Sequence, residues 1–317
     1  MTADAAPPLR RVGFLGPEGT FTEQALLSQP DLSSEELVPM STFGEILAAV
    51  DAGEIDLGFV GIENSIEGTV TVTMDALALE HDLLIQREVV LGIQLNLLAP
   101  PGTGLADIRR VLTFPVAAAQ CRTWLARELP GVEVVAANSN AEAARLVGEE
   151  ADGVSAAVAP ALAAKIYGLD VLAEGIEDHS ENETRFVLVG HGPVPPPTGH
   201  DKTTIVVFQR TDRAGSLLAI LQEFAARNIN LTKLESRPTK KALGDYCFII
   251  DLEGHLDDKL LSDCLRDVRS KVADIKYLGS YPAAGVHGPA RRRDAEEAWR
   301  AADAWINAQR ARLTPPS

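Results

Sequence analysis

The segment RVGFLGPEGTFTEQA, residues Arg11–Ala25, reads as a strand, a glycine-rich turn and a helix in direct succession. Its first five residues have the apolar composition of a buried strand, and Thr20 with Glu23 forms the capping box that starts many helices. The same alternation of strand and helix continues to Val189. Such alternation indicates a largely parallel sheet covered on both faces, so the sequence predicts an α/β fold for this part of the chain.

A proline-rich stretch separates this part from a smaller one. Residues 192–202 contain four prolines, a composition typical of a stiff linker. Residues 203–281 then follow the order strand, helix, strand, strand, helix, strand, which is the ferredoxin-like βαββαβ unit. Beyond this unit, the helical spacing of apolar residues predicts a C-terminal helix over residues 290–312.

Composition and charge exclude several classes of protein. The 317 residues are 46% apolar and 23% charged, close to the average for globular proteins, and the length predicts about two or three domains. The formal net charge of −16 argues against a nucleic-acid partner, because such a partner requires a basic face. Val89–Ala106 is the longest uncharged run, but its prolines, glycines and amides do not suit a membrane span. We therefore predict no nucleic-acid partner and no membrane partner.

The cysteines and histidines show none of the spacings of metal sites or disulfide frameworks. The three cysteines are far apart with no CxxC pair, and the six histidines form no HExxH or HxxxH pair. We predict neither a metal nor a disulfide. Met1–Arg11 places two prolines and a charged pair where a signal peptide has its apolar stretch, which predicts a cytoplasmic protein.

The turn after the first strand, Gly16–Glu23, is a candidate anion site. Backbone N–H groups and the positive end of the helix dipole face such a turn, and Gly19, Thr20 and Phe21 lie within it. The alternative is a capped helix without a ligand.

A second polar cluster, Gly61–Thr69, follows the apolar strand Leu57–Ile62. Open α/β sheets bind ligands outside the carboxyl ends of their strands. Glu63, Asn64 and Ser65 are therefore candidate binding residues, with an ordinary polar loop as the alternative.

The third candidate is the segment Asn182–Phe186, which opens a strand and contains Thr184, Arg185 and Phe186. It supplies a hydroxyl donor, a guanidinium able to hold a carboxylate, and an aromatic packing face. In an acidic chain, an arginine that faces a cleft can anchor an anionic substrate. The alternative for the arginine is a surface ion pair with Glu181 or Glu183.

Together these motifs resemble those of the prephenate dehydratase family, and residues 203–281 resemble an ACT domain of the phenylalanine-sensing kind. The resemblance covers residues 10–281 and is carried by GPEGTFTEQA (Gly16–Ala25), IENSIEGTV (Ile62–Val70), TRF (Thr184–Phe186) and NLTKLESRP (Asn230–Pro238). It implies a two-lobed, periplasmic-binding-protein-like catalytic domain over residues 10–191. The second lobe would lie near residues 92–178.

The resemblance implies a lyase that converts prephenate to phenylpyruvate in L-phenylalanine synthesis, with loss of carbon dioxide and water. No cofactor is implied, because aromatisation of the product ring supplies much of the driving force. Thr184 would donate a hydrogen bond to the leaving hydroxyl. The implied substrate-binding residues are Gly19, Thr20, Phe21, Glu63, Asn64, Ser65, Arg185 and Phe186, of which the last can instead pack within its strand.

The ACT resemblance implies feedback regulation by L-phenylalanine. ACT modules pair edge to edge, which covers unpaired strand edges, so a homodimer or homotetramer is expected. The effector pocket would combine a helix-starting turn of one subunit with a strand of its partner; the alternative is a module that only dimerises the enzyme. The implied effector-binding residues are Gly215, Ser216, Leu217, Asn230, Leu231, Glu235, Ser236, Arg237 and Pro238.

Three stretches depart from the family pattern. Phe114–Cys121 and Leu91–Leu98 lack histidines that many members carry there, so those histidines cannot be essential here. Asp212–Leu217 reads DRAGSL where D-x-P-G-A-L is usual, which leaves the effector affinity open. Two other functions also stay open from sequence alone, namely an arogenate dehydratase and a non-catalytic protein that binds an amino acid or a keto acid.

Overall fold

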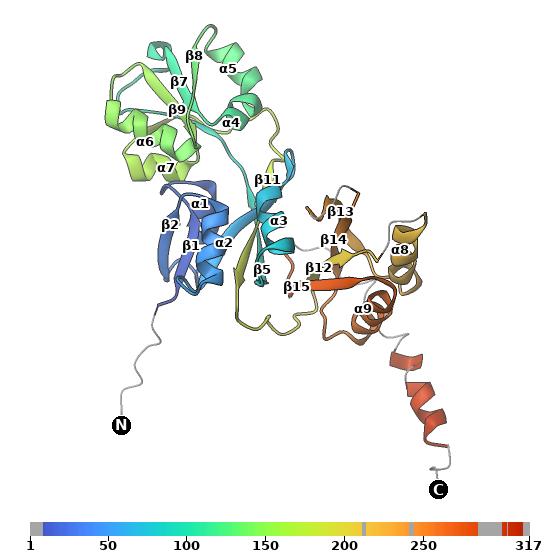
Figure 1. Ribbon diagram of the computed structural model, residues 1–317. Coiled ribbons are helices and arrows are strands. Elements are labelled where there is room, and N and C mark those ends of the chain that lie inside the picture. Colours follow the sequence, from blue (N-terminus) through green and yellow to red (C-terminus); the bar gives the residue numbers. More distant parts are fainter. Residues whose placement is uncertain (1–8, 211–213, 241–243, 285–299, 303, 313–317) are drawn as a thin grey trace, which may run out of the picture. The chain divides into compact units, whose positions relative to one another are not determined.

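The computed structural model describes residues 9–210, 214–240, 244–284, 300–302 and 304–312. The chain divides into two compact units that interleave along the sequence. The first unit runs to Leu77 and continues from Val89 to His191, whereas the second comprises Ala78–Glu88 and the chain from Gly192 onward. Figure 1 labels most of their helices and strands.

The first unit contains two sheets. One of them includes both the first and the last strand of the unit. Its strand order is β2-β1-β3-β11-β5, with the short β4 paired to β3. β1 runs parallel to β2 and β3, whereas β11 runs antiparallel to β3. The elements of this lobe are β1 (Arg11–Leu15), α1 (Phe21–Leu27), β2 (Glu36–Met40), α2 (Phe43–Asp51), β3 (Leu57–Asn64), β4 (Gly68–Thr69), α3 (Thr71–Leu79), β5 (Leu84–Gly92) and β11 (Glu183–Gly190).

The second sheet is formed entirely between β5 and β11 and defines a second lobe. Its order is β10-β6-β9-β7-β8, with β7 parallel to β8 and β9, and β6 antiparallel to β9 and β10. Its elements are β6 (Asn96–Ala99), a 3₁₀ turn (Leu105–Asp107), β7 (Arg110–Thr113), α4 (Pro115–Gln120), α5 (Arg122–Glu128), β8 (Glu133–Ala136), α6 (Asn140–Glu150), β9 (Ser155–Ala159), α7 (Ala161–Tyr167) and β10 (Asp170–Ala173).

Both sheets are mixed, although the sequence pattern indicated largely parallel ones. The antiparallel strands are those by which the chain enters or leaves a lobe: β6 and β10 in the second lobe, and β11 in the first. Neighbouring strands are parallel when a β-α-β crossover connects them. A strand that connects two lobes has no such crossover to its neighbour, so it can pair in the antiparallel direction. The predicted fold class, a two-lobed α/β catalytic region, is otherwise confirmed.

Aromatic packing holds β3 against β11 in the core of the first lobe. Phe186 is 3% exposed, and its ring stacks on that of Phe59 with 5.4 Å between centroids. Both rings belong to a buried cluster that includes Val12 and Phe14 of β1. The strands that carry the candidate site therefore rest on a rigid apolar layer.

The second unit contains the predicted βαββαβ fold. Its four strands form an antiparallel sheet in the order β13-β14-β12-β15, and α8 and α9 cover one face over a single apolar core. The elements are β12 (Asp201–Phe208), α8 (Ser216–Ala226), β13 (Leu231–Pro238), β14 (Tyr246–Glu253), α9 (Lys259–Lys271) and β15 (Asp274–Pro282).

Residues 78–88 lie between two segments of the first unit in sequence but pack in the second. Gly279 on β15 has φ +135, and a Cβ there would lie 2.3 Å from the backbone oxygen of Ile85. The buried Glu88 carboxylate receives Lys202 Nζ at 2.9 and 3.0 Å. Strand β5 thus belongs to both units, because its residues from Val89 on lie in the first.

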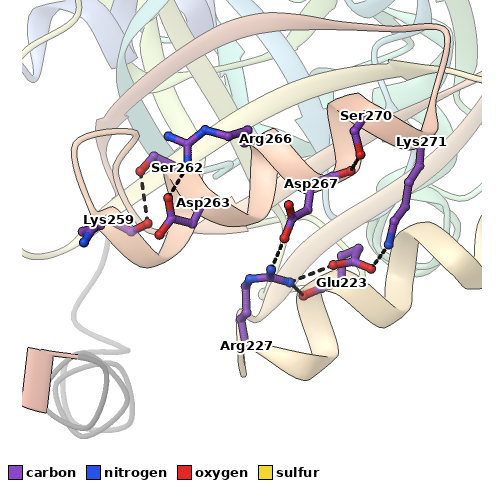
Figure 2. A network of polar contacts seen from close by, with 9 residues as sticks. All are labelled: Glu223, Arg227, Lys259, Ser262, Asp263, Arg266, Asp267, Ser270 and Lys271. Atoms are coloured by element: carbon purple, nitrogen blue, oxygen red, sulfur yellow. Dashed lines mark hydrogen bonds and ion pairs between the residues drawn. The ribbon is translucent and has the colours of Figure 1, made fainter. Parts of the chain in front are cut away.

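A charged network joins the two helices of the second unit (Figure 2). Arg227, the residue directly after α8, donates to Glu223 Oε2 at 2.8 Å, one turn earlier, and also pairs with Asp267 on α9. Lys271 on α9 pairs with Glu223 in return. The hydrogen bonds from Lys271 and Arg227 lower the pKa of Glu223.

Replacing Glu223 with Gln should destabilise the second unit by roughly 1 kcal/mol near neutral pH. A carboxyl whose pKa is lowered by folding stabilises the fold above its unfolded pKa, and this contribution is lost as the pH falls. The difference in melting temperature between the variant and the wild type should therefore shrink below about pH 4. Thermal unfolding from pH 3 to 8 measures it.

Asp263→Asn is a matched control, because its partner Arg266 is 73% exposed and the pair lies outside this network (Figure 2). We expect a smaller shift at every pH. Equal shifts for Glu223→Gln and Asp263→Asn would show that the network adds nothing beyond single surface pairs.

The predicted C-terminal helix falls only partly within the described residues. Residues 300–302 and 304–310 are helical, and residues 290–299 and 303 lie outside the described chain. Trp305 is 62% exposed.

Candidate functional site

Two motifs that lie far apart in sequence meet on neighbouring strands. Because β11 runs antiparallel to β3, Thr184 lies opposite Asn64 and Arg185 lies opposite Glu63. The register shifts directly after Arg185, as in a β-bulge, a feature common next to active sites. Two contacts between the strands result at this end of the sheet: a hydroxyl meets an amide, and a guanidinium meets a carboxylate.

Asn64 fixes the hydrogen-bonding role of the Thr184 hydroxyl. Its Oδ1 accepts from the backbone N–H groups of Ile66 and Glu67, both at 3.0 Å, so its amide nitrogen faces the other way. That nitrogen lies 2.9 Å from Thr184 Oγ1, and an amide nitrogen only donates. Thr184 accepts at this contact, and its own proton must point to a different acceptor.

Arg185 is buried, with its side chain 10% exposed. Its Nη1 lies 3.3 Å from Oε2 of Glu63 on β3. This contact joins neighbouring strands, unlike the surface pair with Glu181 or Glu183 that was the alternative. The guanidinium presents its donors in a planar fork suited to carboxylates.

Ser65 ties the end of β3 to the segment that leads into β11. Its hydroxyl accepts from the backbone N–H of Glu183 at 2.9 Å and donates to the carbonyl of Glu181 at 3.3 Å. Its own backbone N–H donates to the carbonyl of Glu183 at 2.8 Å. The hydroxyl of Ser65 thus has a bracing role in this structure.

The glycine-rich turn after β1 forms a closed capping box. Thr20 Oγ1 donates to the carbonyl of Leu15 at 2.8 Å and accepts from the backbone N–H of Glu23 at 3.2 Å. The Glu23 carboxylate accepts from the backbone N–H of Gly19. Burial raises the pKa of Glu23. The hydroxyl of Thr20 is engaged in capping, as in the ligand-free alternative.

The same turn contacts the second lobe. Gly19 has φ +89, and a Cβ there would lie 3.2 Å from the Cα of Ala163 on α7. The Tyr167 hydroxyl donates to the carbonyl of Glu18 at 2.6 Å, and Phe21 packs on the apolar core of the second lobe. Gly19 and Phe21 therefore lie where the two lobes meet.

Two residues outside the predicted site extend the polar cluster. Asn182 is 1% exposed; its Oδ1 accepts from Asn64 at 2.8 Å and its Nδ2 donates to Gln120 Oε1 at 3.0 Å. Gln120 ends α4 of the second lobe and donates to Glu67 at 3.3 Å. Asn182 opens the candidate segment Asn182–Phe186 and Gln120 lies within Phe114–Cys121, but no local pattern assigns either side chain a role.

A cavity of about 490 Å³ in the second unit includes part of the predicted effector site. Gly215 and Ser216, at the start of α8, line it together with Arg210 and Lys271. Leu217 packs on the apolar core of the same unit. None of the described lining residues comes from β13.

The effector residues on β13 divide between the two faces of the sheet. Glu235 lies 3.8 Å from Arg237 Nη1, and these alternate residues share one face. Ser236 and Pro238 are exposed in the alternating pattern of this strand. Asn230 precedes the strand and Leu231 begins it, with Leu231 packed on the core beneath the helices.

The described residues contain no group of three or more His, Cys, Asp or Glu side chains placed to hold a metal. All three cysteines are buried free thiols. Burial raises the pKa of Cys121 to about 12 and that of Cys264 to about 11, which does not suit a nucleophile. Among the described helices, none has the length and apolarity needed to cross a membrane.

Comparison with known proteins matches both parts of the chain. A family model described as prephenate dehydratase matches residues 12–194, and an ACT domain model matches residues 203–270. A protein named prephenate dehydratase from Mycobacterium tuberculosis (strain ATCC 25618 / H37Rv) is 45% identical over 292 residues, which cover 88% of this chain and 90% of that protein.

Solved structures are similar over most of their length. Prephenate dehydratase from Arthrobacter aurescens, in complex with L-Phe, aligns with a TM-score of 0.84 and 40% identity, covering 94% of this chain and 98% of that one. A structure described as GqqA, a novel type of quorum quenching acylase, aligns with a TM-score of 0.79 and 32% identity, covering 87% and 98%.

Proposed function

The chain belongs to the prephenate dehydratase family, and we propose on this basis that it converts prephenate to phenylpyruvate for L-phenylalanine synthesis. In this reaction the bond between the ring and its carboxylate breaks and carbon dioxide leaves. The electron pair of that bond completes the aromatic ring, and the ring hydroxyl departs with one added proton as water. No oxidant, reductant or cofactor is needed. Because prephenate is a metabolite of the cell, we expect the protein to act in the cytoplasm.

The hydrogen bond from Asn64 to Thr184 is the observation that carries the mechanism. Since Asn64 Nδ2 donates at 2.9 Å, the Thr184 proton is directed to another acceptor, and the leaving hydroxyl of prephenate is a suitable one. A threonine is a weak acid, so it stabilises the developing charge by a hydrogen bond and does not release a free proton. The proton itself reaches the departing oxygen from solvent.

We assign carboxylate recognition to Arg185, whose planar fork matches a carboxylate. Glu63 holds that guanidinium in place from the neighbouring strand at 3.3 Å. Asn64 orients the donor, and Ser65 braces the loop around it. The turn containing Gly19, Thr20 and Phe21 lies where the two lobes meet, and Phe186 supports the site from the core.

Arg185→Lys should raise the KM for prephenate by about 10-fold with a smaller change in kcat, because an ammonium cannot make the paired contacts of the fork. Steady-state kinetics with prephenate measures both constants. Arg127→Lys is the matched control, because Arg127 is an exposed arginine in a surface pair with Glu128. An unchanged KM in Arg185→Lys would remove Arg185 from substrate recognition.

Turnover of prephenate by the purified full chain tests the proposed function. Phenylpyruvate should accumulate and carbon dioxide should be released in equal amount. Arogenate is assayed in parallel, and a preference for it would reassign the substrate. Binding of prephenate without turnover would favour a non-catalytic binding protein. Because one similar structure is described as an acylase, an acylated homoserine lactone provides a third assay, and turnover of it alone would overturn the dehydratase assignment.

We further propose that L-phenylalanine binds the ACT domain and regulates turnover. The similar structure from Arthrobacter aurescens contains L-Phe, and the cavity beside Gly215 and Ser216 lies at the start of α8, where backbone N–H groups favour a carboxylate. By the resemblance to ACT domains, β13 of a partner subunit would complete this pocket in a dimer or tetramer.

Calorimetric titration of the full chain with L-phenylalanine, with D-phenylalanine as the control, tests this regulation. We expect saturable binding of the L-enantiomer and inhibition of turnover at the same concentrations. Analytical ultracentrifugation measures the oligomeric state. Absence of binding would reduce the ACT domain to a structural role, and a monomer would contradict a shared pocket.

A further inference from the structure

Asn182 connects three separate parts of the catalytic unit through one buried side chain. It directly precedes β11, and its Oδ1 accepts from Asn64 at the end of β3. Its Nδ2 donates to Gln120 at the end of α4, in the second lobe. At 1% exposure, this amide cannot exchange its partners for water, so each lost contact would leave an unsatisfied polar group.

These side chains form a series of hydrogen bonds that runs from Asn64 through Asn182 to Gln120. Groups that can only donate or only accept lie at its two ends, and they set the direction of each hydrogen bond between them. At one end, two backbone N–H groups occupy Asn64 Oδ1 and turn its Nδ2 toward Thr184, Asn182 and the carbonyl of Glu183. At the other end, the Glu67 carboxylate accepts from Gln120 Nε2, which turns Gln120 Oε1 toward Asn182. Asn182 can satisfy both neighbours in only one orientation.

We propose that Asn182 is a positioning residue: it accepts one of the two protons of Asn64 Nδ2 and so directs the other proton toward Thr184, and it does so only when α4 of the second lobe supplies Gln120. The inference rests on the proposed function, because it concerns the hydroxyl assigned to the leaving group. It implies that the orientation of the Thr184 proton depends on the placement of the second lobe. Substrate that holds the lobes together would then also orient the donor.

A double-mutant cycle distinguishes this role from a general structural one. Asn182→Ala should lower kcat by roughly 10- to 100-fold, less than loss of the Thr184 hydroxyl, with little change in KM. In a chain that already carries Thr184→Ala, the same substitution should lower the remaining kcat by less than about 2-fold, because the group through which Asn182 acts is gone. Losses that multiply would overturn the proposal, as would a kcat of wild-type size in Asn182→Ala.

Two further variants keep the test decisive if Asn182→Ala is unstable. Asn182→Asp preserves volume but places an oxygen against Gln120 Oε1, so we expect a lower kcat and non-additivity with Thr184→Ala here as well. Asn96 is an equally buried asparagine, 1% exposed, with backbone partners in the second lobe. Asn96→Ala should cost stability but leave kcat within about 3-fold of wild type. A kcat loss in Asn96→Ala that matches the loss in Asn182→Ala would reduce Asn182 to a structural residue.

The experiment also separates this inference from the proposed function. If wild-type protein does not turn over prephenate, the proposed function fails and no cycle can be measured. If wild type and Thr184→Ala differ as expected but Asn182 variants behave additively, only the positioning role fails.

Discussion

Thr184→Val should lower kcat for prephenate by roughly 100- to 1000-fold, the usual cost of removing one donor that stabilises charge in the transition state. Valine keeps the shape and the strand preference of threonine, so the fold should survive. The loss should fall on kcat more than on KM, because the hydrogen bond strengthens as the hydroxyl departs. Steady-state kinetics, with circular dichroism to verify folding, measures the effect.

Thr184→Ser is the control for this prediction. Serine retains the hydroxyl that accepts from Asn64 at this position, so kcat should stay within about 10-fold of wild type despite greater side-chain freedom. Comparable activity in the valine and wild-type proteins would exclude Thr184 as the donor. The site would then need another hydrogen-bond donor for the leaving group.

Gly279→Ala should destabilise the second unit by roughly 2 to 6 kcal/mol, the combined cost of overpacking and of a strained backbone. The new Cβ would lie 2.3 Å from the oxygen and 3.0 Å from the nitrogen of Ile85. Both atoms are backbone, so no side chain can rotate away. We expect the thermal transition of this unit to fall by roughly 10 °C or more.

Gly199→Ala separates the two contributions. Gly199 also has a positive φ, +87, but a Cβ there meets nothing within 4 Å, so only the backbone strain applies and the cost should be about 1 kcal/mol. Differential scanning calorimetry of both variants provides the comparison. Equal losses would show that residues 78–88 do not pack against β15 as closely as described.

The sequence was sufficient to predict local structure and the identity of the motifs, because both depend on residues close together in the chain. The capping box of Thr20 and Glu23 was predicted and is present. The βαββαβ order after residue 200 was also predicted, since six elements follow one another with short connections. Periodicity and turn residues carry that information.

Contacts between distant strands could not be predicted in the same way. The register that places Thr184 opposite Asn64 joins residues 120 positions apart, and no local pattern encodes it. For the same reason, local reasoning names only sequence neighbours as ion partners of Arg185, whereas Glu63 lies 122 positions away. The contacts of Asn182 could not be predicted either, because they include Gln120, which belongs to the other lobe.

The position of residues 78–88 limits how this chain can be divided. The proline-rich linker suggests a modular enzyme whose regulatory part could be cut off or exchanged at residue 192. A chain shortened there would keep the buried Glu88 but lose its partner Lys202, and would uncover the strand segment that packs on Gly279. In such a fragment, residues 78–88 would lack the unit against which they pack. Recombination of this regulatory module between enzymes would therefore require two matched crossovers, one at the linker and one around β5.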